Sequence, residues 1–201
     1  AVSDGRLAGD AYVQYANGDG PRRVNSDNDQ LTARLRGHLI GDDVTLTVSL
    51  DYYSGRFGEP GGLSRARLDA DPRDGSTPFD RVRIERFAPS IGLDWQLDDL
   101  TQLTARAFYS RFERESWRQA GGSFGQITPA ENVLVRQLQA FHTAGIDVRV
   151  RRDFGGNAQH SLTFGALGHS SNAPVTVDKG NSNNDFIGLA GPVARVARSG
   201  D

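Results

Sequence analysis

The sequence of 201 residues contains no cysteine and no methionine, and only one of its 23 basic residues, Lys179, is a lysine. The absence of cysteine excludes a disulfide framework, a thiolate metal site and a cysteine nucleophile. No apolar run exceeds about three residues, whereas a membrane-spanning helix needs about 20, so a helical membrane protein is excluded. The net charge of −2 excludes a strongly basic nucleic-acid-binding arm, and we expect no nucleic-acid partner.

Arginine therefore supplies 22 of the 23 basic side chains. A GC-rich genome explains such a bias, but the guanidinium group is also a permanent, planar donor suited to carboxylates and phosphates. The chain opens Ala1-Val2-Ser3-Asp4, with no initiator methionine and no signal peptide. We therefore expect either a mature chain or a piece of a longer one.

Apolar and polar residues alternate along most of the chain, which is the pattern of β-strands with one apolar face. The predicted strands lie at about Leu7–Ala16, Leu31–Leu39, Val44–Tyr53, Ser90–Leu97, Gln102–Ser110, Gln137–Arg151 and Leu162–Ala166. Several have the roughly 9–11 residues that a transmembrane β-strand needs. The sequence thus predicts an all-β fold: an antiparallel transmembrane β-barrel segment of about seven long strands.

The predicted connections alternate in length, as in outer-membrane barrels with short periplasmic turns and long extracellular loops. The short turns are Gly41–Asp43, Asp98–Asp99 (within a hairpin at Leu97–Leu100) and Asp153–Asn157, and the long loops are 17–28, 54–83 and 115–132. From about Ser170 we expect loop-like chain. Because a proline cannot donate to a strand ladder, we expect Pro89 to lie at a bulge or near a strand end.

Four arginines lie in the middle of predicted strands: Arg34, Arg36, Arg106 and Arg149. An arginine facing lipid at mid-depth costs roughly 2–4 kcal/mol. We therefore predict that all four face a lumen, away from the surface that carries Leu46 and Ile146. Seven strands cannot close a single-chain bacterial barrel, which has an even number, usually 8 or more. Either an eighth strand lies in the tail or the chain is a piece of a larger barrel, and we favour the piece.

Six short segments of the chain carry a resemblance to a known family: Leu50–Tyr53, Gly58–Leu63, Asp69–Arg73, Arg23–Ser26, Phe108–Arg114 and Trp117–Gln119. These segments resemble the barrel of TonB-dependent outer-membrane receptors, most closely the ferric-dicitrate-type transporters. The resemblance covers roughly residues 5–170, and Gly58–Leu63 is its most specific element. It implies part of a 22-stranded barrel that imports ferric chelates or other scarce nutrients. Residues 1–201 would then be a partial barrel domain that lacks the plug and the C-terminal strands.

Candidate ligand-binding residues lie where strands enter the long loops. We predict that Arg22, Arg23, Arg111, Arg114 and Arg118 bind an anionic chelate, since guanidinium groups pair bidentately with carboxylates, and that Trp117 offers a stacking surface. Alternatively, these arginines form only solvated ion pairs with nearby acidic residues, or face lipid phosphates.

Nothing in the sequence indicates catalysis or a resident metal. The four histidines, His38, His142, His160 and His169, form no zinc-type ligand pair, and no Ser/His/Asp spacing supports a triad. We predict no enzyme activity, no metal site and no cofactor.

The sequence therefore favours a segment of a TonB-dependent receptor in a bacterial outer membrane. Its expected partners are a ferric chelate or other small molecule, the TonB system through a region N-terminal to this chain, and outer-membrane lipid. A soluble β-sandwich binding module of a secreted protein is the alternative, and an outer-membrane barrel enzyme comes third. The apolar face of Val44–Leu50 distinguishes the first two, because it meets lipid in a barrel and a second sheet in a sandwich.

Overall fold

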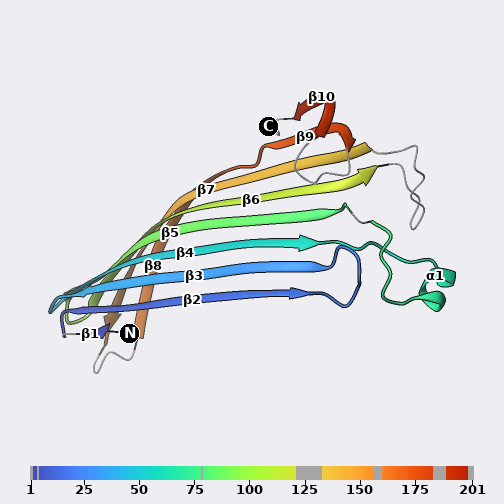
Figure 1. Ribbon diagram of the computed structural model, residues 1–201. Helices are drawn as coiled ribbons and strands as arrows, with labels where there is room; N and C mark the ends of the chain where they lie inside the picture. The colour runs from blue at the N-terminus through green and yellow to red at the C-terminus, as the bar shows by residue number, and fades with distance from the viewer. Residues whose placement is uncertain are drawn as a thin grey trace.

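The computed structural model describes residues 2–3, 5–77, 79–120, 133–155, 160–182 and 189–198, which form one antiparallel sheet and one short helix (Figure 1). The elements are β1 (Val2–Ser3), β2 (Leu7–Asp19), β3 (Asp27–Ile40), β4 (Val44–Gly58), α1 (Arg65–Ala70), β5 (Arg81–Asp98), β6 (Thr101–Ala120), β7 (Val133–Phe154), β8 (His160–Asn172), β9 (Val175–Ser182) and β10 (Leu189–Arg198). From β1 to β7, neighbours in the sheet are neighbours in the chain. The expected all-β antiparallel fold is confirmed.

The two strands β8 and β9 continue one another along the same edge of β7. Their pairing has one register, from Phe154↔His160 through His142↔Asn172 to Gln139↔Val175. The interruption falls at Ala173–Pro174, where Ala140 N still donates to Pro174 O at 3.0 Å. Counted this way, the described residues form an open meander of eight long strands.

The eighth long strand is β10, which lies in the part of the chain that we expected to be loop-like. That expectation, which began at about Ser170, is wrong because β8, β9 and β10 occupy most of this stretch. The sequence of β10 is rich in small residues and contains Pro192, so hydrophobic alternation does not reveal it.

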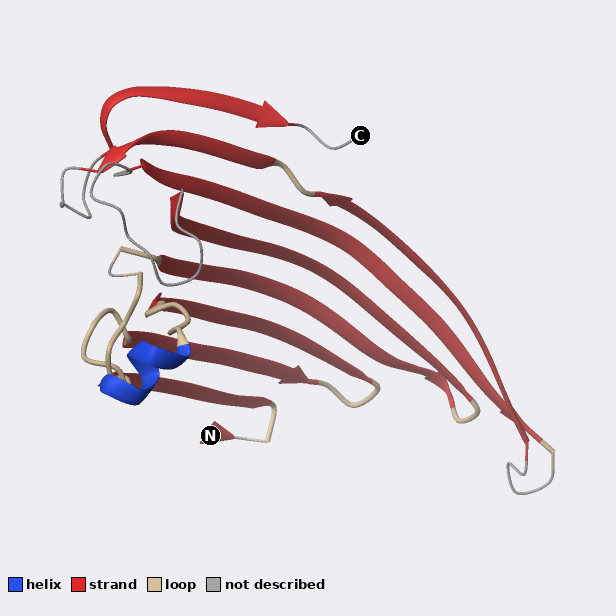
Figure 2. Cartoon of the chain, turned by 90° about the vertical axis from the view of Figure 1, so that its right-hand side faces the viewer, coloured by secondary structure: helices blue, strands red, loops and turns tan. Residues whose placement is uncertain are grey.

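The short turns lie at one end of the sheet, as expected (Figure 2). Gly41 N donates to Val44 O at 2.7 Å in the turn between β3 and β4, and Leu100 N donates to the Asp98 carboxylate at 2.9 Å between β5 and β6. The third turn was expected at Asp153–Asn157, of which residues 156–159 lie outside the described part. The long connections are shorter than expected: β4 extends to Gly58, and β6 extends to Ala120.

The expectation for Pro89 is wrong. This proline lies in the middle of β5, opposite Leu50, and the register to β6 is the same before it (Phe87↔Arg111) and after it (Ser90↔Phe108). Around the proline only the pairs of Ala88 and Pro89 are missing from the β6 ladder, and the register shifts only farther along, between Gln96 and Asp98. Because Pro89 has no backbone N–H, hydrogen bonding to β6 is lost at this point, but the register between β5 and β6 does not change there.

Cross-strand pairing separates an apolar face from a polar one. Leu39, Leu46, Leu93, Ala105 and Val148 are successive partners along one row. Arg34, Arg36, Arg106 and Arg149 occupy positions of the opposite parity, and Arg34 Nε lies 2.5 Å from the Asp51 carboxylate. Because side chains alternate along a strand, all four arginines point away from Leu46 and Ile146, as predicted.

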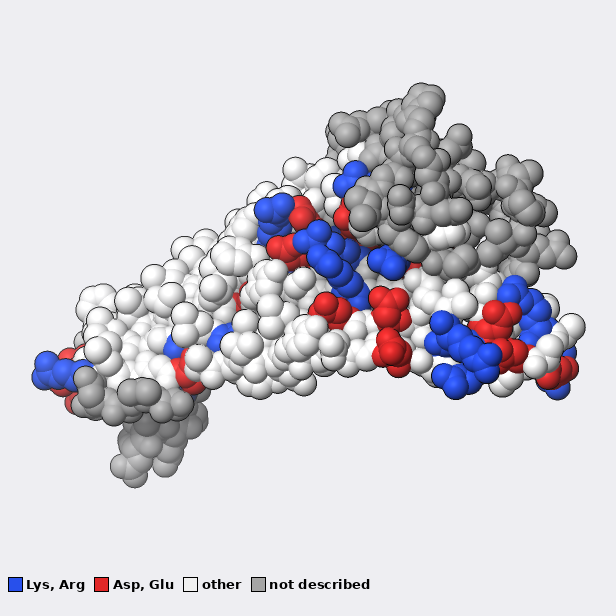
Figure 3. All heavy atoms as spheres, in the orientation of Figure 1, with Lys and Arg blue, Asp and Glu red and all other residues white. Residues whose placement is uncertain are grey.

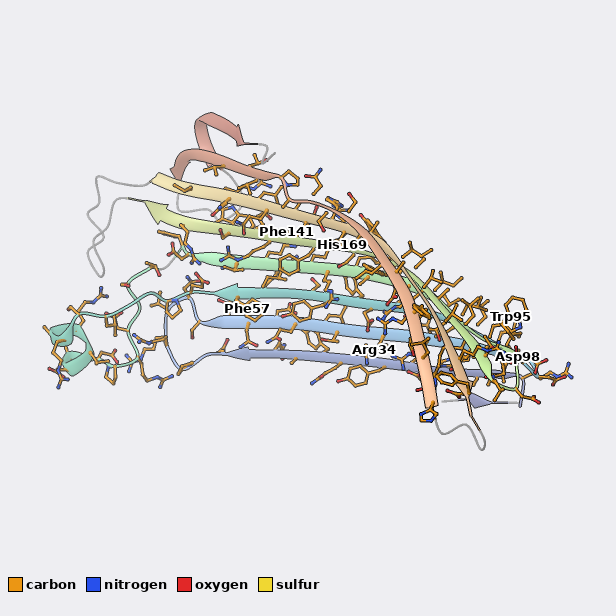
Figure 4. All side chains as sticks on the ribbon, turned by 180° about the vertical axis from the view of Figure 1, so that it is seen from behind. Arg34, Phe57, Trp95, Asp98, Phe141 and His169 are labelled. Atoms are coloured by element: carbon orange, nitrogen blue, oxygen red, sulfur yellow. The ribbon has the colours of Figure 1, made fainter. Side chains whose placement is uncertain are left out.

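The sheet is curled. β8 passes behind the strands β3–β5 in Figure 1 and in front of them in Figure 4, which is seen from behind, so the concave side faces the viewer of Figure 4. The convex side in Figure 3 is mostly uncharged from near its left end, where the short turns lie, to the middle of the view, where charged side chains begin to gather. We call the apolar face outward and the polar face inward. No second sheet covers the outward face in the described part of the chain, where Val48 is 53% exposed.

The outward apolar surface has the height of an outer-membrane barrel. In β5 every outward residue from Phe87 to Leu97 is apolar. This stretch is about 33 Å long along the strand and rises about 23 Å along the axis of a barrel whose strands are tilted by ~45°, close to the roughly 25 Å apolar band of such barrels. Tyr15, Tyr52 and Phe87 are the last apolar outward residues of their strands toward the long loops, and Tyr109 is the last one on β6 before the charged outward residues Arg111, Glu113 and Glu115. These four form an aromatic girdle whose level shifts from strand to strand, as strand tilt requires.

Candidate ligand-binding surface

Two loops at the girdle end of the sheet pack against each other, the β2–β3 loop (residues 20–26) and the β4–β5 loop (residues 59–80), which contains α1. Asn25 joins them: its side-chain Nδ2 donates to the carbonyls of Glu59 at 3.1 Å, Thr77 at 2.7 Å and Asp80 at 2.5 Å. Asn25 has a φ of 51°, a left-handed conformation that asparagine tolerates better than most residues.

The predicted ligand residues Arg22 and Arg23 take part in this loop contact. Arg22 Nη1 donates to Asp74 O at 2.8 Å, and Arg23 Nη1 lies 3.3 Å from the Asp71 carboxylate. The backbone N of Arg23 also donates to Arg73 O at 2.6 Å. Both guanidinium groups therefore hold the second loop to the first.

Arg118 points inward from β6 and reaches the two ends of the β4–β5 loop. It forms ion pairs with Glu59 and with Asp80, the latter at 3.8 Å. Asp80 is 8% exposed, and the neighbouring Ser116 is 2% exposed. Partial burial lowers the pKa of the Arg118 guanidinium, although an arginine remains charged at every physiological pH. Arg118 is therefore engaged in holding the loop ends.

The other predicted residues on β6 divide between the two faces. Arg111 and Trp117 have outward parity and pair with Phe87 and Arg81, whereas Arg114 has inward parity. The stacking surface expected from Trp117 thus lies on the opposite face from Arg114 and Arg118. The structure brings Arg114 together with Gln139, whose Oε1 accepts from Arg114 Nη1 at 3.4 Å.

Sequence reasoning missed Arg86, which lies inward on β5, one row below Arg114. Its row runs Tyr53, Arg86, Phe112, Phe141 across four strands. The rings of Phe112 and Phe141 lie 5.8 Å apart at 52°, a tilted stacking geometry. Arg86 is exposed, and within the described residues it makes no ion pair and no side-chain hydrogen bond.

We call Tyr53, Arg86, Phe112, Arg114 and Phe141 the inward patch. Phe141 and the nearby Phe57 are labelled on the concave side in Figure 4. Gly55 lets the aromatic rings lie close, because a Cβ there would come within 2.7 Å of both the Phe57 ring and the Tyr53 hydroxyl. Two guanidinium groups beside aromatic surfaces can bind an anion with a flat or partly apolar body.

The β4–β5 loop contains one titratable contact with a clear pH dependence. A hydrogen bond from Arg67, followed by one from the backbone N–H of Gly75, lowers the pKa of the Asp74 carboxyl. Because the pKa of Asp74 is lowered in the folded loop, its carboxylate stabilises the loop at every pH above the ordinary aspartate pKa of about 3.9. This stabilisation is lost as the pH falls through the lowered pKa of the folded state.

We expect hydrogen exchange in residues 71–75 of the full-length protein to be unchanged between pH 8 and 5, after correction for intrinsic rates. It should rise only below about pH 4. Asp74→Asn removes the titrating group, so its protection should lose this pH step. A step of equal size in Asp74→Asn would assign the effect to another group.

Among the described residues, no group of three or more histidine or acidic side chains could hold a metal ion. No helix in the described part of the chain is long and apolar enough to cross a membrane.

No family model matches the sequence. Among solved structures, the sheet is similar to the crystal structure of the ferric citrate transporter FecA in the unliganded form, with a TM-score of 0.71. The chain has the fold of part of the FecA barrel. The match has 21% sequence identity and covers 96% of this chain but 28% of FecA, so the likeness shows the fold alone. The match is to a transporter rather than an enzyme.

Proposed function

We propose that this chain forms part of the barrel of a TonB-dependent outer-membrane receptor that takes up an anionic ferric chelate or a similar scarce nutrient. Residues 1–201 would contribute strands to the barrel domain, and the plug and the other strands would belong to a longer protein. That plug region would contact the TonB system. The exposed outward surface and the FecA-like fold support placement in the outer membrane.

The inward patch is the observation that carries the ligand proposal. Arg86 and Arg114 lie on adjacent rows of the concave face, near the long loops through which a ligand would enter. Among the described residues, the Arg114 guanidinium has the neutral Gln139 as its one hydrogen-bond partner, so its charge is available to a carboxylate. Arg149 and Arg151, two inward arginines nearer the short turns, are by contrast paired, with Asp147 at 2.7 Å and with Asp153 at 3.0 Å.

The positions of these side chains reduce the number of candidate ligand-binding residues. Arg114 remains our first candidate and Arg86 joins it, while Arg22, Arg23 and Arg118 would act indirectly by positioning the loops. Arg111 and Trp117 face outward, so we do not place them in the chelate site. FecA carries ferric citrate by its description, and a citrate complex has the carboxylates that these arginines would bind.

Binding of ferric citrate to the purified full-length receptor tests the proposal. Charge-assisted hydrogen bonds contribute about 1.5–3 kcal/mol each, so Arg86→Gln combined with Arg114→Gln should weaken binding at least about 100-fold. Arg151→Gln is the matched control, because it removes an inward arginine at the opposite end of the sheet, and its affinity should stay within about twofold. Equal affinities of the double variant and the wild type would remove the inward patch from the site.

A further inference from the structure

Aromatic side chains surround the two arginines of the inward patch. Arg86 lies between Tyr53 and Phe112 in one cross-strand row, and Phe141 follows Phe112 on the next strand. The inward face of a transmembrane barrel is normally polar. A row of three aromatic rings on this face therefore requires an explanation of its own.

The rings of this row keep surface that faces the lumen. Phe112 and Phe141 pack against each other with their centroids 5.8 Å apart, yet Phe141 is 38% exposed on the concave side (Figure 4). Tyr53 and Phe112 are half-buried. Toward the short turns, the next inward positions of the same three strands are polar: Asp51, Ser110 and Thr143. The rings therefore offer an apolar surface to a molecule that enters the lumen.

The charge of this surface is positive. Across the described strands from β2 to β9, the two rows that contain Arg86 and Arg114 include no carboxylate. Arg34 lies one row closer to the short turns and is paired with Asp51, and the carboxylates at the ends of the β4–β5 loop are paired with Arg118. Neighbouring carboxylates in the described residues therefore leave the charges of Arg86 and Arg114 to an anionic ligand.

The spacing of the strands places the body of such a ligand on the rings. Neighbouring strands lie about 4.8 Å apart, so the rings contributed by β4, β6 and β7 extend over about 14 Å, with Arg86 among them. A molecule whose anionic oxygen is bound by Arg86 therefore lies over Tyr53 or Phe112. An aromatic ring at this place gains offset or tilted stacking in addition to the apolar area that it buries. The citrate skeleton of methylene, hydroxyl and carboxylate groups gains no stacking and little apolar contact.

We propose that the inward patch selects ferric chelates whose anionic oxygens are carried on aromatic rings, such as catecholates and aryl carboxylates, over aliphatic chelates such as ferric citrate. Arg86 and Arg114 bind the anionic oxygens, and Tyr53, Phe112 and Phe141 contact the rings of the chelator. This inference rests on the proposed function and narrows the chemical class of its ligand.

The test measures binding of two ferric complexes to the full-length receptor, one with protocatechuate, which is a catechol carboxylate, and one with citrate. We expect the wild type to bind ferric protocatechuate at least about tenfold more tightly. Phe112→Leu combined with Phe141→Leu keeps apolar side chains but removes two rings. The affinity for ferric protocatechuate should then fall about tenfold, while the affinity for ferric citrate stays within about twofold. Phe108→Leu is the matched control, because Phe108 is an inward aromatic residue of β6 nearer the short turns, and both of its affinities should equal those of the wild type.

Equal or tighter binding of ferric citrate by the wild type would overturn this inference and leave the proposed function standing. Parallel losses of both affinities in the double leucine variant would also overturn it, since the rings would then only keep the patch in shape.

Two iron-free tricarboxylates of equal charge separate the two proposals: trimellitate, built on a benzene ring, and tricarballylate, built on a propane chain. If neither ferric complex binds, the proposed function fails, and tighter binding of trimellitate than of tricarballylate still supports selection of aromatic anions by the patch. Equal binding of the two tricarboxylates would overturn that selection. The same wild-type comparison decides if the double leucine variant does not fold.

Discussion

An arginine at position 91 is expected to reduce the amount of folded receptor in the outer membrane sharply, whereas an arginine at position 92 is expected to be tolerated. Ile91 is an outward residue of β5 in the middle of the apolar surface and is 47% exposed. A lipid-facing arginine at that depth costs roughly 2–4 kcal/mol, a large fraction of the stability of a typical protein. Gly92 points inward, where a Cβ would meet no atom closer than 3.8 Å.

The two variants introduce the same side chain one residue apart, so charge and size are matched and only the face differs. The measurement is the fraction of full-length receptor that is folded in outer-membrane preparations, judged by its mobility without heating. Ile91→Val serves as the control for the loss of isoleucine packing and should behave like the wild type. If Ile91→Arg and Gly92→Arg fold equally well, the outward face does not meet lipid.

The middle parts of the strands could be predicted from sequence because they lie within the apolar surface. The residues from Val44 to Tyr52, for example, alternate apolar and polar without exception, and the whole stretch lies in β4. A slip of one residue would bury every polar side chain in lipid. The two-residue spacing of apolar side chains therefore predicts both the position of the strand and the face of the sheet on which each side chain lies.

The strand ends could not be predicted by the same signal. β6 extends to Ala120, but beyond Tyr109 it carries Arg111, Glu113 and Glu115 on the outward face. Outside the apolar surface neither face must be hydrophobic, so alternation disappears while hydrogen bonding to the neighbouring strands continues. The misjudged end of β6 made Trp117 and Arg118 appear as loop residues that could share one site.

Of the two arginines in the inward patch, only one was predicted from the sequence. Arg114 is among the predicted residues, but Arg86 is not, because the predicted loop ends at residue 83 and the predicted strand begins only at Ser90, so Arg86 falls between them with no face assigned. Once β5 is known to begin at Arg81, parity alone places Arg86 inward. The loop contacts of Arg22 and Arg23 join residues about fifty positions apart, and nothing in the local sequence indicates them.

Replacing Asn25 with aspartate is expected to separate the two packed loops at neutral pH. The Asn25 side chain donates to the carbonyls of Thr77 and Asp80 at 2.7 and 2.5 Å, and aspartate has the same shape without a donor. Its carboxylate would face carbonyl oxygens in a site so close that a Cβ on Gly58 would lie 2.7 Å from Asn25. An unsatisfied buried group costs about 1–3 kcal/mol, and a charged one costs more.

Hydrogen exchange of residues 59–77 in the full-length receptor measures this effect, and three variants separate its causes. Asn25→Gly keeps the left-handed backbone and loses the side-chain amide, so the protection of residues 59–77 against hydrogen exchange should fall moderately. Asn25→Ala adds the strain of a positive φ, roughly 1–2 kcal/mol, and should fall further. Asn25→Asp should lose most protection at pH 7 and regain part of it near pH 4, because a protonated carboxyl donates one hydrogen bond. Wild-type protection in Asn25→Asp at pH 7 would show that the amide does not hold the loops together.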